Sequence, residues 1–181
     1  MNADDVDDYW WRQRYDDALF ARTGRLPGEP DPTGPGRPSR LLVTGSRNFS
    51  DAALMAESLL SAIDDYSLGL EVVVVHGNAR GADRVADAAA RKLGLLEPEP
   101  HDAKWNDPCR PTCRPGHRRP SPDGGTFCPA AGNYRNQAMV DLGADVMVAF
   151  PLGASTGTRD AMRRARQAGI PVREIEPGAK R

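Results

Sequence analysis

Three turns of this chain combine glycine, arginine and hydroxyl side chains, a combination suited to holding phosphate. They are residues 44–47 (TGSR), 76–83 (HGNARGAD) and 151–159 (PLGASTGTR). Glycine lets backbone amides approach a ligand closely, and the N-terminus of a following helix adds partial positive charge. Arginine can then contact phosphate oxygens in a bidentate fashion. The turns therefore indicate an anion site, although tight turning and helix capping alone would also explain each of them.

A fourth segment, residues 131–137 (AGNYRNQ), opens a helical pattern with an arginine and an asparagine. In an open parallel sheet the turns after the strands meet at one edge, so the four segments predict a shared cleft. The predicted ligand contacts are Gly45, Ser46, Arg47, Gly77, Arg80, Gly81, Asp83, Arg135, Asn136, Ser155, Thr156, Gly157 and Thr158.

A second kind of chemistry is indicated between residues 107 and 129, a stretch rich in proline, glycine and arginine. It holds Cys109, Cys113, His117 and Cys128, which are four ligands of the kind that zinc prefers. Free thiols beside an incidental histidine are the alternative. Zinc binding would explain how a loop with so little to pack becomes ordered, so we expect a structural zinc. Four arginines give the loop a basic surface, which is more often solvated than bound: Arg110, Arg114, Arg118 and Arg119.

The composition narrows the class of protein. A net charge of −1 with 27% charged residues gives no reason to expect unspecific binding to nucleic acid or to a membrane surface. No run approaches the roughly 18 apolar residues of a membrane span, and the N-terminus is acidic, so we expect a cytoplasmic protein. The three cysteines are an odd number, which favours metal or free thiols over disulfides. The oligomeric state stays open, a homo-oligomer included.

The elements that would carry these residues alternate between apolar runs and helical patterns, which is typical of a parallel α/β sheet. Strands are expected at 41–43, 71–75, 95–101, 146–150 and 171–175, and helices at 52–65, 82–93, 133–142 and 158–168. Pro98 and Pro100 confine the third strand to an edge or an irregular path. The prediction is a three-layer Rossmann-like domain at 40–177 with the insertion at 107–129. It is preceded by an amphipathic helix at 1–24 and a Pro/Gly linker at 25–39, and followed by a tail at 178–181.

The motifs resemble the YspA/YpsA-related branch of the SLOG superfamily. They occur in order from the first turn to the last and span essentially all of residues 40–176. The resemblance implies a Rossmannoid sheet and the binding of nucleotides, including NAD- or ADP-ribose-derived signals, in bacterial and phage conflict. It also implies that eleven residues of the motifs contact the ligand: Gly45, Ser46, Arg47, Gly77, Gly81, Asp83, Arg135, Asn136, Thr156, Gly157 and Thr158.

Relatives in the same superfamily, the LOG-type phosphoribohydrolases, carry a catalytic glutamate shortly after a Pro-Gly-Gly-x-Gly-Thr loop. At the corresponding position this chain has Ala161, and Asp160 is one residue early, about 100° away around a helix. N-glycosidic cleavage needs a carboxylate near the sugar, so the departure favours binding over hydrolysis. Asp83 and Asp160 remain the candidates for a catalytic role; for Asp83 a helix-dipole residue is the alternative.

The sequence is therefore compatible with three functions. The first is a nucleotide-binding sensor or sequestering protein, and the second is a nucleotide hydrolase of phosphoribohydrolase type. The third is a single-stranded nucleic-acid-binding module, because the DprA group of the superfamily binds DNA; the balanced charge and few aromatic residues weaken it. His76 is interpreted as a positioning residue under the cleft. Trp105 could stack on a base or close the pocket, but an aromatic residue flanking a sheet edge is more often part of the core.

Overall fold

A computed structural model describes residues 37–68, 71–94 and 96–176 of the chain, and its centre is a five-stranded parallel sheet. In chain order the strands are β1 (Ser39–Gly45), β2 (Val72–His76), β3 (Leu96–Pro100), β6 (Val146–Phe150) and β7 (Val172–Glu174). Their spatial order is β3-β2-β1-β6-β7. The predicted N-terminal helix and all but the last residues of the predicted linker lie outside the described residues.

Strand β1 lies in the middle of the sheet, between β2 and β6. Its residues 41–43 are fully buried, because a central parallel strand is covered on both faces. Strand β3 is at one edge of the sheet. Pro98 and Pro100 have no N–H to donate, and an edge strand tolerates this because it has a neighbour on one side only. The prediction of a Rossmann-like parallel sheet with an edge third strand is confirmed.

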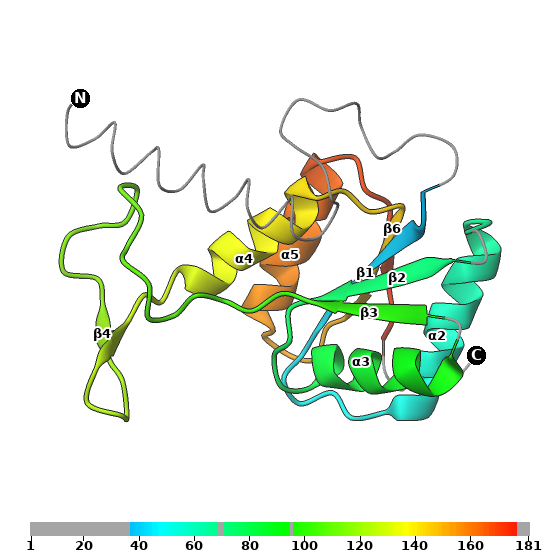
Figure 1. Cartoon of the computed structure of the whole chain (residues 1–181), viewed down its shortest axis with the longest axis horizontal. Coiled ribbons are helices and arrows are strands. Elements are labelled where there is room, and N and C mark those ends of the chain that lie inside the picture. Colours follow the sequence, from blue (N-terminus) through cyan, green and yellow to red (C-terminus); the bar gives the residue numbers. More distant parts are fainter. Residues whose placement is uncertain (1–36, 69–70, 95, 177–181) are drawn as a thin grey trace. The chain divides into compact units, whose positions relative to one another are not determined.

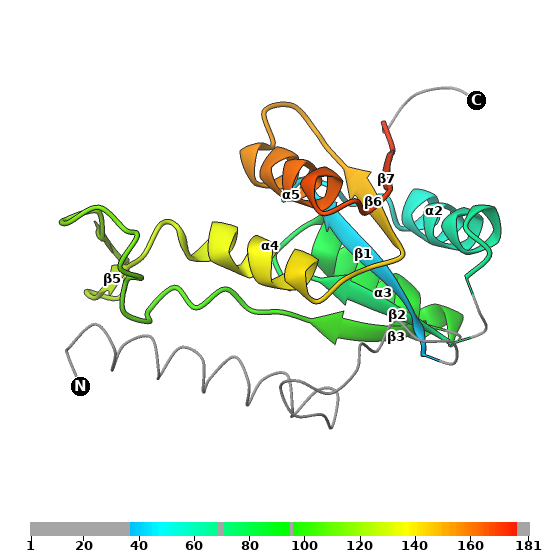
Figure 2. The ribbon, with the colours of Figure 1, turned by 90° about the horizontal axis from the view of Figure 1, so that it is seen from above.

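Helices cover both faces of the sheet, as Figures 1 and 2 show. On one face, α2 (Ala52–Asp65) and α3 (Ala82–Leu93) pack with the side chains of alternate strand residues into one apolar cluster. On the other, α4 (Ala131–Asp141) and α5 (Thr156–Gln167) form a second cluster with the intervening strand residues. Both α4 and α5 begin two residues before their predicted starts.

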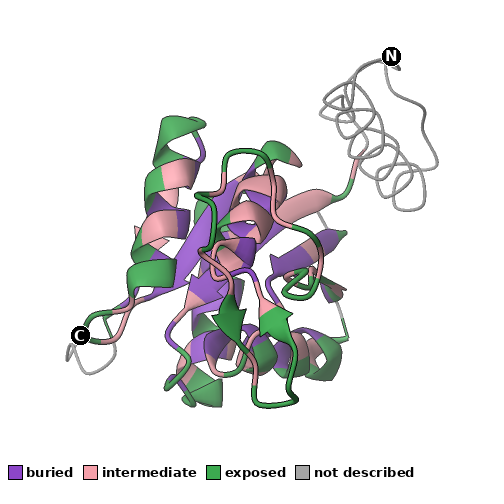
Figure 3. Cartoon of the chain, turned by 90° about the vertical axis from the view of Figure 1, so that its left-hand side faces the viewer, coloured by how far each residue is buried: buried purple, intermediate pink, exposed green. Residues whose placement is uncertain are grey.

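The insertion leaves the sheet after β3 and returns at the start of α4. It contains a two-residue antiparallel ladder, β4 (Arg119–Pro120) with β5 (Thr126–Phe127), which the sequence did not predict. Most of its residues are exposed or half-buried, and Figure 3 shows the loop in front of the sheet. Arg118 ties the ladder to the entry of the loop by donating to the Asp107 carbonyl at 2.7 Å and the Thr126 hydroxyl at 2.8 Å.

Among the described helices, none combines the length and the apolar character that crossing a membrane requires.

Candidate functional site

A cleft of about 880 Å³ opens at the C-terminal ends of the strands, where β1 and β6 lie side by side although the chain between them visits β2 and β3. This reversal of strand order is where open α/β sheets bind ligands, and the volume is in the range of small-molecule sites. Of the predicted contacts, all but two line the cleft: Gly45, Ser46, Arg47, Gly77, Asp83, Arg135, Asn136, Ser155, Thr156, Gly157 and Thr158. Arg80 and Gly81 are not among its lining residues.

Gly81 has a packing role instead. Its φ is +86°, and a Cβ on it would overlap the backbone of Ser46 and Arg47. The next amide, that of Ala82, donates to the Ser46 carbonyl at 3.1 Å. Gly45 is likewise closed in by the Ala82 side chain. These two glycines therefore allow the turn after β1 to pack on the start of α3, and Gly45 also lines the cleft.

Arg135 reaches from α4 across the ends of β2 and β3. Its guanidinium lies directly over Gly77, where a Cβ would overlap it, and donates to the Gly77 carbonyl and to the His101 carbonyl at 3.2 Å. Burial lowers the pKa of Arg135, but an arginine stays protonated at neutral pH. Gly77 thus makes room for a half-buried positive charge in the cleft.

Two carboxylates line the cleft in opposite electrostatic environments. Asp83 is only 6% exposed, and this burial raises its pKa even though it accepts the Ala79 amide at 3.1 Å. Burial also disfavours the Asp160 carboxylate, but its hydrogen bonds with Arg164 and Arg163 outweigh that effect and lower its pKa. The sequence alone did not separate these two groups.

The placement of Asp160 corrects the sequence-based argument about the missing glutamate. Ala161 was expected to hold the cleft-facing position, with Asp160 turned away, but Ala161 is 1% exposed and packs in the core under α5. Asp160 lines the cleft. An alanine at position 161 therefore does not deprive the cleft of a carboxylate, because Asp160 supplies one from the preceding position.

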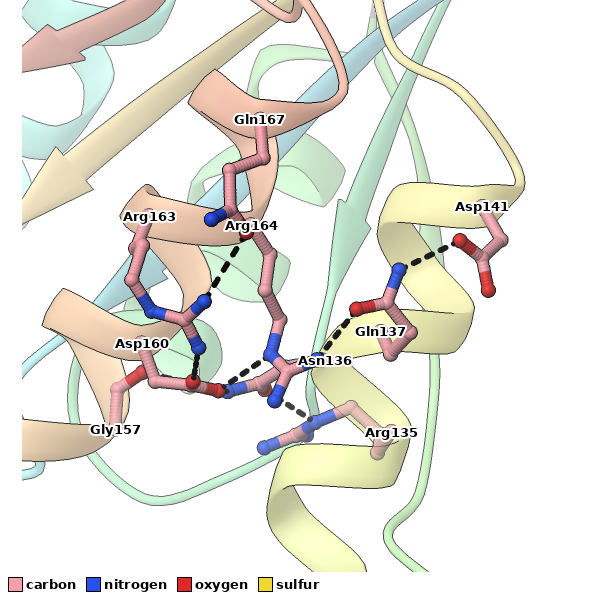
Figure 4. Close-up of polar contacts among 9 residues, drawn as sticks. All are labelled: Arg135, Asn136, Gln137, Asp141, Gly157, Asp160, Arg163, Arg164 and Gln167. Carbon is pink, nitrogen blue, oxygen red and sulfur yellow. Dashed lines mark hydrogen bonds and ion pairs between the residues drawn. The ribbon is translucent and has the colours of Figure 1, made fainter.

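A polar network joins α4 to α5 beneath the cleft, as Figure 4 shows. The Asn136 amide nitrogen donates to the Gly157 carbonyl at 3.3 Å and lies 3.5 Å from Asp160, while its oxygen accepts from Arg135 Nε at 3.1 Å. Asn136 is 6% exposed. Its side chain therefore fixes Arg135 relative to the start of α5.

The N-terminus of α5 opens into the cleft without a side-chain cap. Ser155, the residue before it, turns its hydroxyl back to the Leu152 carbonyl at 2.6 Å. The first amides of a helix have no carbonyl partner within it and carry partial positive charge. Thr156 and Gly157 are exposed there, and a Cβ on Gly157 would meet only open space. This is the wall of the cleft best suited to an anion.

His76 and Trp105 differ in their burial. His76 is fully buried; its Nδ1 accepts the Asn78 amide at 3.2 Å, and burial lowers its pKa, as fits a positioning residue. Trp105 was expected in the core, but it is 36% exposed and lines the cleft. That expectation was wrong because the strand β3 ends at Pro100 and the chain has left the sheet before reaching the indole.

The insertion brings its four metal-ligand candidates together. One ligand atom from each of Cys109, Cys113, His117 and Cys128 lies within 4.8 Å of the others. Around a tetrahedral zinc with Zn–S of about 2.3 Å, two sulfurs are about 3.8 Å apart. The Sγ atoms of Cys113 and Cys128 are 3.9 Å apart, and Cys128 Sγ lies 3.5 Å from His117 Nε2. The group can hold a metal ion, and three thiols with one imidazole suit zinc.

The metal-ligand group is connected to α4 by Tyr134. The Tyr134 hydroxyl is 3.0 Å from Cys113 Sγ, and Arg110 stacks over the phenol ring at 4.3 Å from its centroid. Sequence reasoning missed Tyr134, because its partners come from a loop about twenty residues away. Arg110 and Arg118 are thus engaged within the protein, while Arg114 and Arg119 are exposed.

Fold and cleft together define a Rossmann-like α/β protein with a cleft at its strand-order reversal and a Cys/His-rich loop beside it. The chain belongs to the YspA, cpYpsA-related SLOG family, whose sequence profile matches residues 39–107. It is 42% identical over 137 residues to the Gene 61 protein of Mycobacterium phage D29. The matched region covers 74% of this chain and 93% of that protein.

Among solved structures, the fold is similar to the X-ray structure of DNA processing protein A (DprA) from Streptococcus pneumoniae, with a TM-score of 0.54 and 21% sequence identity. The similarity covers 78% of this chain. It covers 51% of the DprA chain, so this chain spans about half the length of that protein. At this identity the likeness is one of fold.

Proposed function

We propose that this protein binds a nucleotide or nucleotide-derived ligand, of the adenine nucleotide, NAD or ADP-ribose type, and acts as a sensor or sequestering protein. The observation that carries the proposal is the uncapped N-terminus of α5, which opens into a cleft that also holds Arg47 and Arg135. Membership of the SLOG family and the fold shared with a DNA-processing protein support a nucleotide-related role. The similarity to a phage protein is compatible with a role in phage and bacterial conflict.

The chemistry of the cleft supports a ligand with a negative end and a hydroxyl-bearing part. Helix amides, the Ser46 and Thr156 hydroxyls and two arginines are donors that suit phosphate oxygens. Asp83 accepts hydrogen bonds and would repel a phosphate, so it suits ribose hydroxyls instead. A phosphorylated nucleoside satisfies both requirements.

The first experiment introduces a negative charge where the phosphate is proposed to bind. Thr156→Asp places a carboxylate in the first turn of α5, where it favours the helix by about 0.3–1 kcal/mol. The same charge repels an anion, so binding of AMP, NAD or ADP-ribose should weaken more than about tenfold while the melting temperature holds or rises. Thr156→Asn is the neutral control.

Mass spectrometry of small molecules released from the denatured protein first narrows the choice of ligand. Calorimetry then measures the affinity of both variants for that ligand. Arg80→Ala serves as a second control, because Arg80 is exposed and does not line the cleft. Unchanged affinity in Thr156→Asp would remove the α5 N-terminus from the site.

A hydrolase of phosphoribohydrolase type is the second candidate, favoured by the two cleft carboxylates. A raised pKa on Asp83 and a lowered one on Asp160 is the kind of division that separates a general acid from a charged partner. Incubation with AMP, NAD and ADP-ribose, followed by chromatography of free base, distinguishes this candidate from simple binding. Base release that disappears in Asp83→Asn would establish turnover.

We further propose that the ion held by the Cys/His group is zinc and that its role is structural. All four positions of a tetrahedral site are supplied by protein side chains, which is typical of structural rather than catalytic zinc. Single-stranded nucleic acid stays the third candidate ligand; the exposed Arg114 and Arg119 support it, and the net charge of −1 speaks against it. A gel-shift titration with oligonucleotides would decide that point.

A further inference from the structure

Trp105 is a large aromatic side chain in an unusual place. Among the described residues only Leu60, Tyr66 and Trp105 are exposed large hydrophobics, and Trp105 is the one that lines the cleft. Water in contact with an indole face is unfavourable, and tryptophan is normally buried over most of its surface. A solvent-exposed indole inside the cleft is therefore a surface suited to binding a flat, apolar group.

The indole is held in place from three sides. The Cys128 amide donates to the Trp105 carbonyl at 2.9 Å, which fixes the backbone to the metal-binding end of the insertion. Phe127 meets the ring edge-on, with centroids 6.1 Å apart and planes at 79°. On the α4 side, the ring edge lies over Gly132, where a Cβ would come within 3.3 Å of Trp105 Cη2. A side chain fixed in this way pays little further entropy when a ligand stacks on it.

The surroundings of Trp105 differ from the anion-binding wall. Ala103, Pro129 and Gly132 line the cleft with it and carry no charge, whereas the α5 side carries helix amides and hydroxyls. The one carboxylate of this segment in the cleft lining, Asp102, accepts a hydrogen bond from the Asn78 side-chain amide at 2.8 Å. Asn133 is exposed at the same end and offers both a donor and an acceptor. An apolar floor with one amide suits the face and the edge of a nucleobase.

We propose that Trp105 is the stacking surface for the base of the bound ligand, so that the segment leading into the Cys/His insertion supplies a base subsite and the α5 turn a phosphate subsite. The inference rests on the proposed nucleotide-binding function and adds the requirement that the ligand carries an aromatic base. Ribose phosphate alone would fill one part of the cleft. Stacking of a base on an aromatic side chain corresponds to a change of roughly tenfold or more in affinity.

The experiment compares a ligand with a base to the same ligand without one. Calorimetry is carried out on the full chain with AMP and with ribose 5-phosphate, for the wild type, Trp105→Ala and Trp105→Phe. In Trp105→Ala, AMP should bind about tenfold or more weakly while ribose 5-phosphate binds as before, and Trp105→Phe should recover most of the AMP affinity. Equal weakening of both ligands, or unchanged AMP affinity, would overturn the proposal.

A second measurement leaves the indole in place, in case Trp105→Ala disturbs the insertion. Replacing the other two tryptophans, Trp10→Phe and Trp11→Phe, makes Trp105 the sole indole. AMP should then quench or shift its fluorescence and ribose 5-phosphate should not; AMP binding with no fluorescence change would overturn the base subsite alone. Absence of any binding of AMP, NAD or ADP-ribose to the wild type would overturn the nucleotide-binding function, and the base subsite with it.

Discussion

At the scale of single residues, the cleft depends on charged groups that are partly withdrawn from water. Arg135 is held by backbone carbonyls, and Asn136 fixes it relative to α5. Asp83 is more deeply buried than Asp160 and has no arginine bonded to it in the way that Asp160 has Arg163 and Arg164. Residue types could be predicted as cleft contacts from their turns, but their charge states depend on burial, which a sequence does not contain.

The contrast between the two carboxylates predicts opposite effects on stability. A carboxyl whose pKa is raised by folding binds more protons in the folded than in the unfolded state, so its contribution falls as pH rises above about 3.9, the unfolded value, and through the folded pKa. Asp83→Asn should therefore be more stable than the wild type at neutral pH. The difference should shrink as the pH falls through the folded pKa of Asp83, where the wild-type carboxyl becomes protonated.

Asp160→Asn is the control of opposite sign. Folding lowers the pKa of Asp160, so its stabilising contribution is present at neutral pH and is lost as pH falls through the folded pKa. This variant should be less stable than the wild type at neutral pH. Urea unfolding of the three proteins from pH 8 down to about pH 3, below the ordinary aspartate pKa of about 3.9, measures both effects. An Asp83→Asn variant that is less stable than the wild type at pH 7 would contradict the burial argument.

At the scale of elements, the sequence predicted the sheet, the edge position of β3 and the four helices that the described residues contain. Period and composition suffice there, because apolar runs and helical patterns report directly on which faces are covered. They do not suffice for the turns. Gly45 and Gly81 carry the same sequence signature as ligand-binding glycines, yet the space over them is filled by Ala82 and by the turn after β1.

This packing predicts an unequal response to the same substitution of the two glycines that flank α3, Gly81 and Gly94. Gly81→Ala introduces a Cβ that overlaps the backbone of Ser46 and Arg47, at a φ and ψ of +86° and −130° that residues with side chains rarely adopt. We expect a loss of about 3 kcal/mol or more in the free energy of unfolding. Gly94→Ala, at the other end of the helix, has open space around its Cβ and a left-handed φ of +66°.

The Gly94 variant should therefore lose only the strain of that conformation, about 1–2 kcal/mol. Chemical denaturation of both variants gives the comparison. Equal losses would mean that the two turns do not depend on close packing, and that Gly81 has another role.

At the scale of the whole described structure, the insertion and the turns of the sheet line one cleft. The sequence identified four metal-ligand candidates, and their atoms do converge. It could not identify the ties from the loop to the cleft, because Tyr134 with Cys113, and Trp105 with Cys128, are pairs that only the folded chain brings together. Through these ties the loop positions both Trp105 and the start of α4.

The last prediction follows from this connection: removing the metal should weaken the cleft as well as unfold the loop. We expect one zinc per chain by elemental analysis after chelator-free purification. A chelator should then lower the melting temperature and the affinity for AMP together, since metal binding supplies the order of a loop with little apolar packing. The combined variant Cys109→Ser and Cys113→Ser is the control, and the chelator should change it no further. Zinc well below half an equivalent would contradict the metal assignment, and full AMP affinity after complete zinc removal would show that the loop and the cleft are independent.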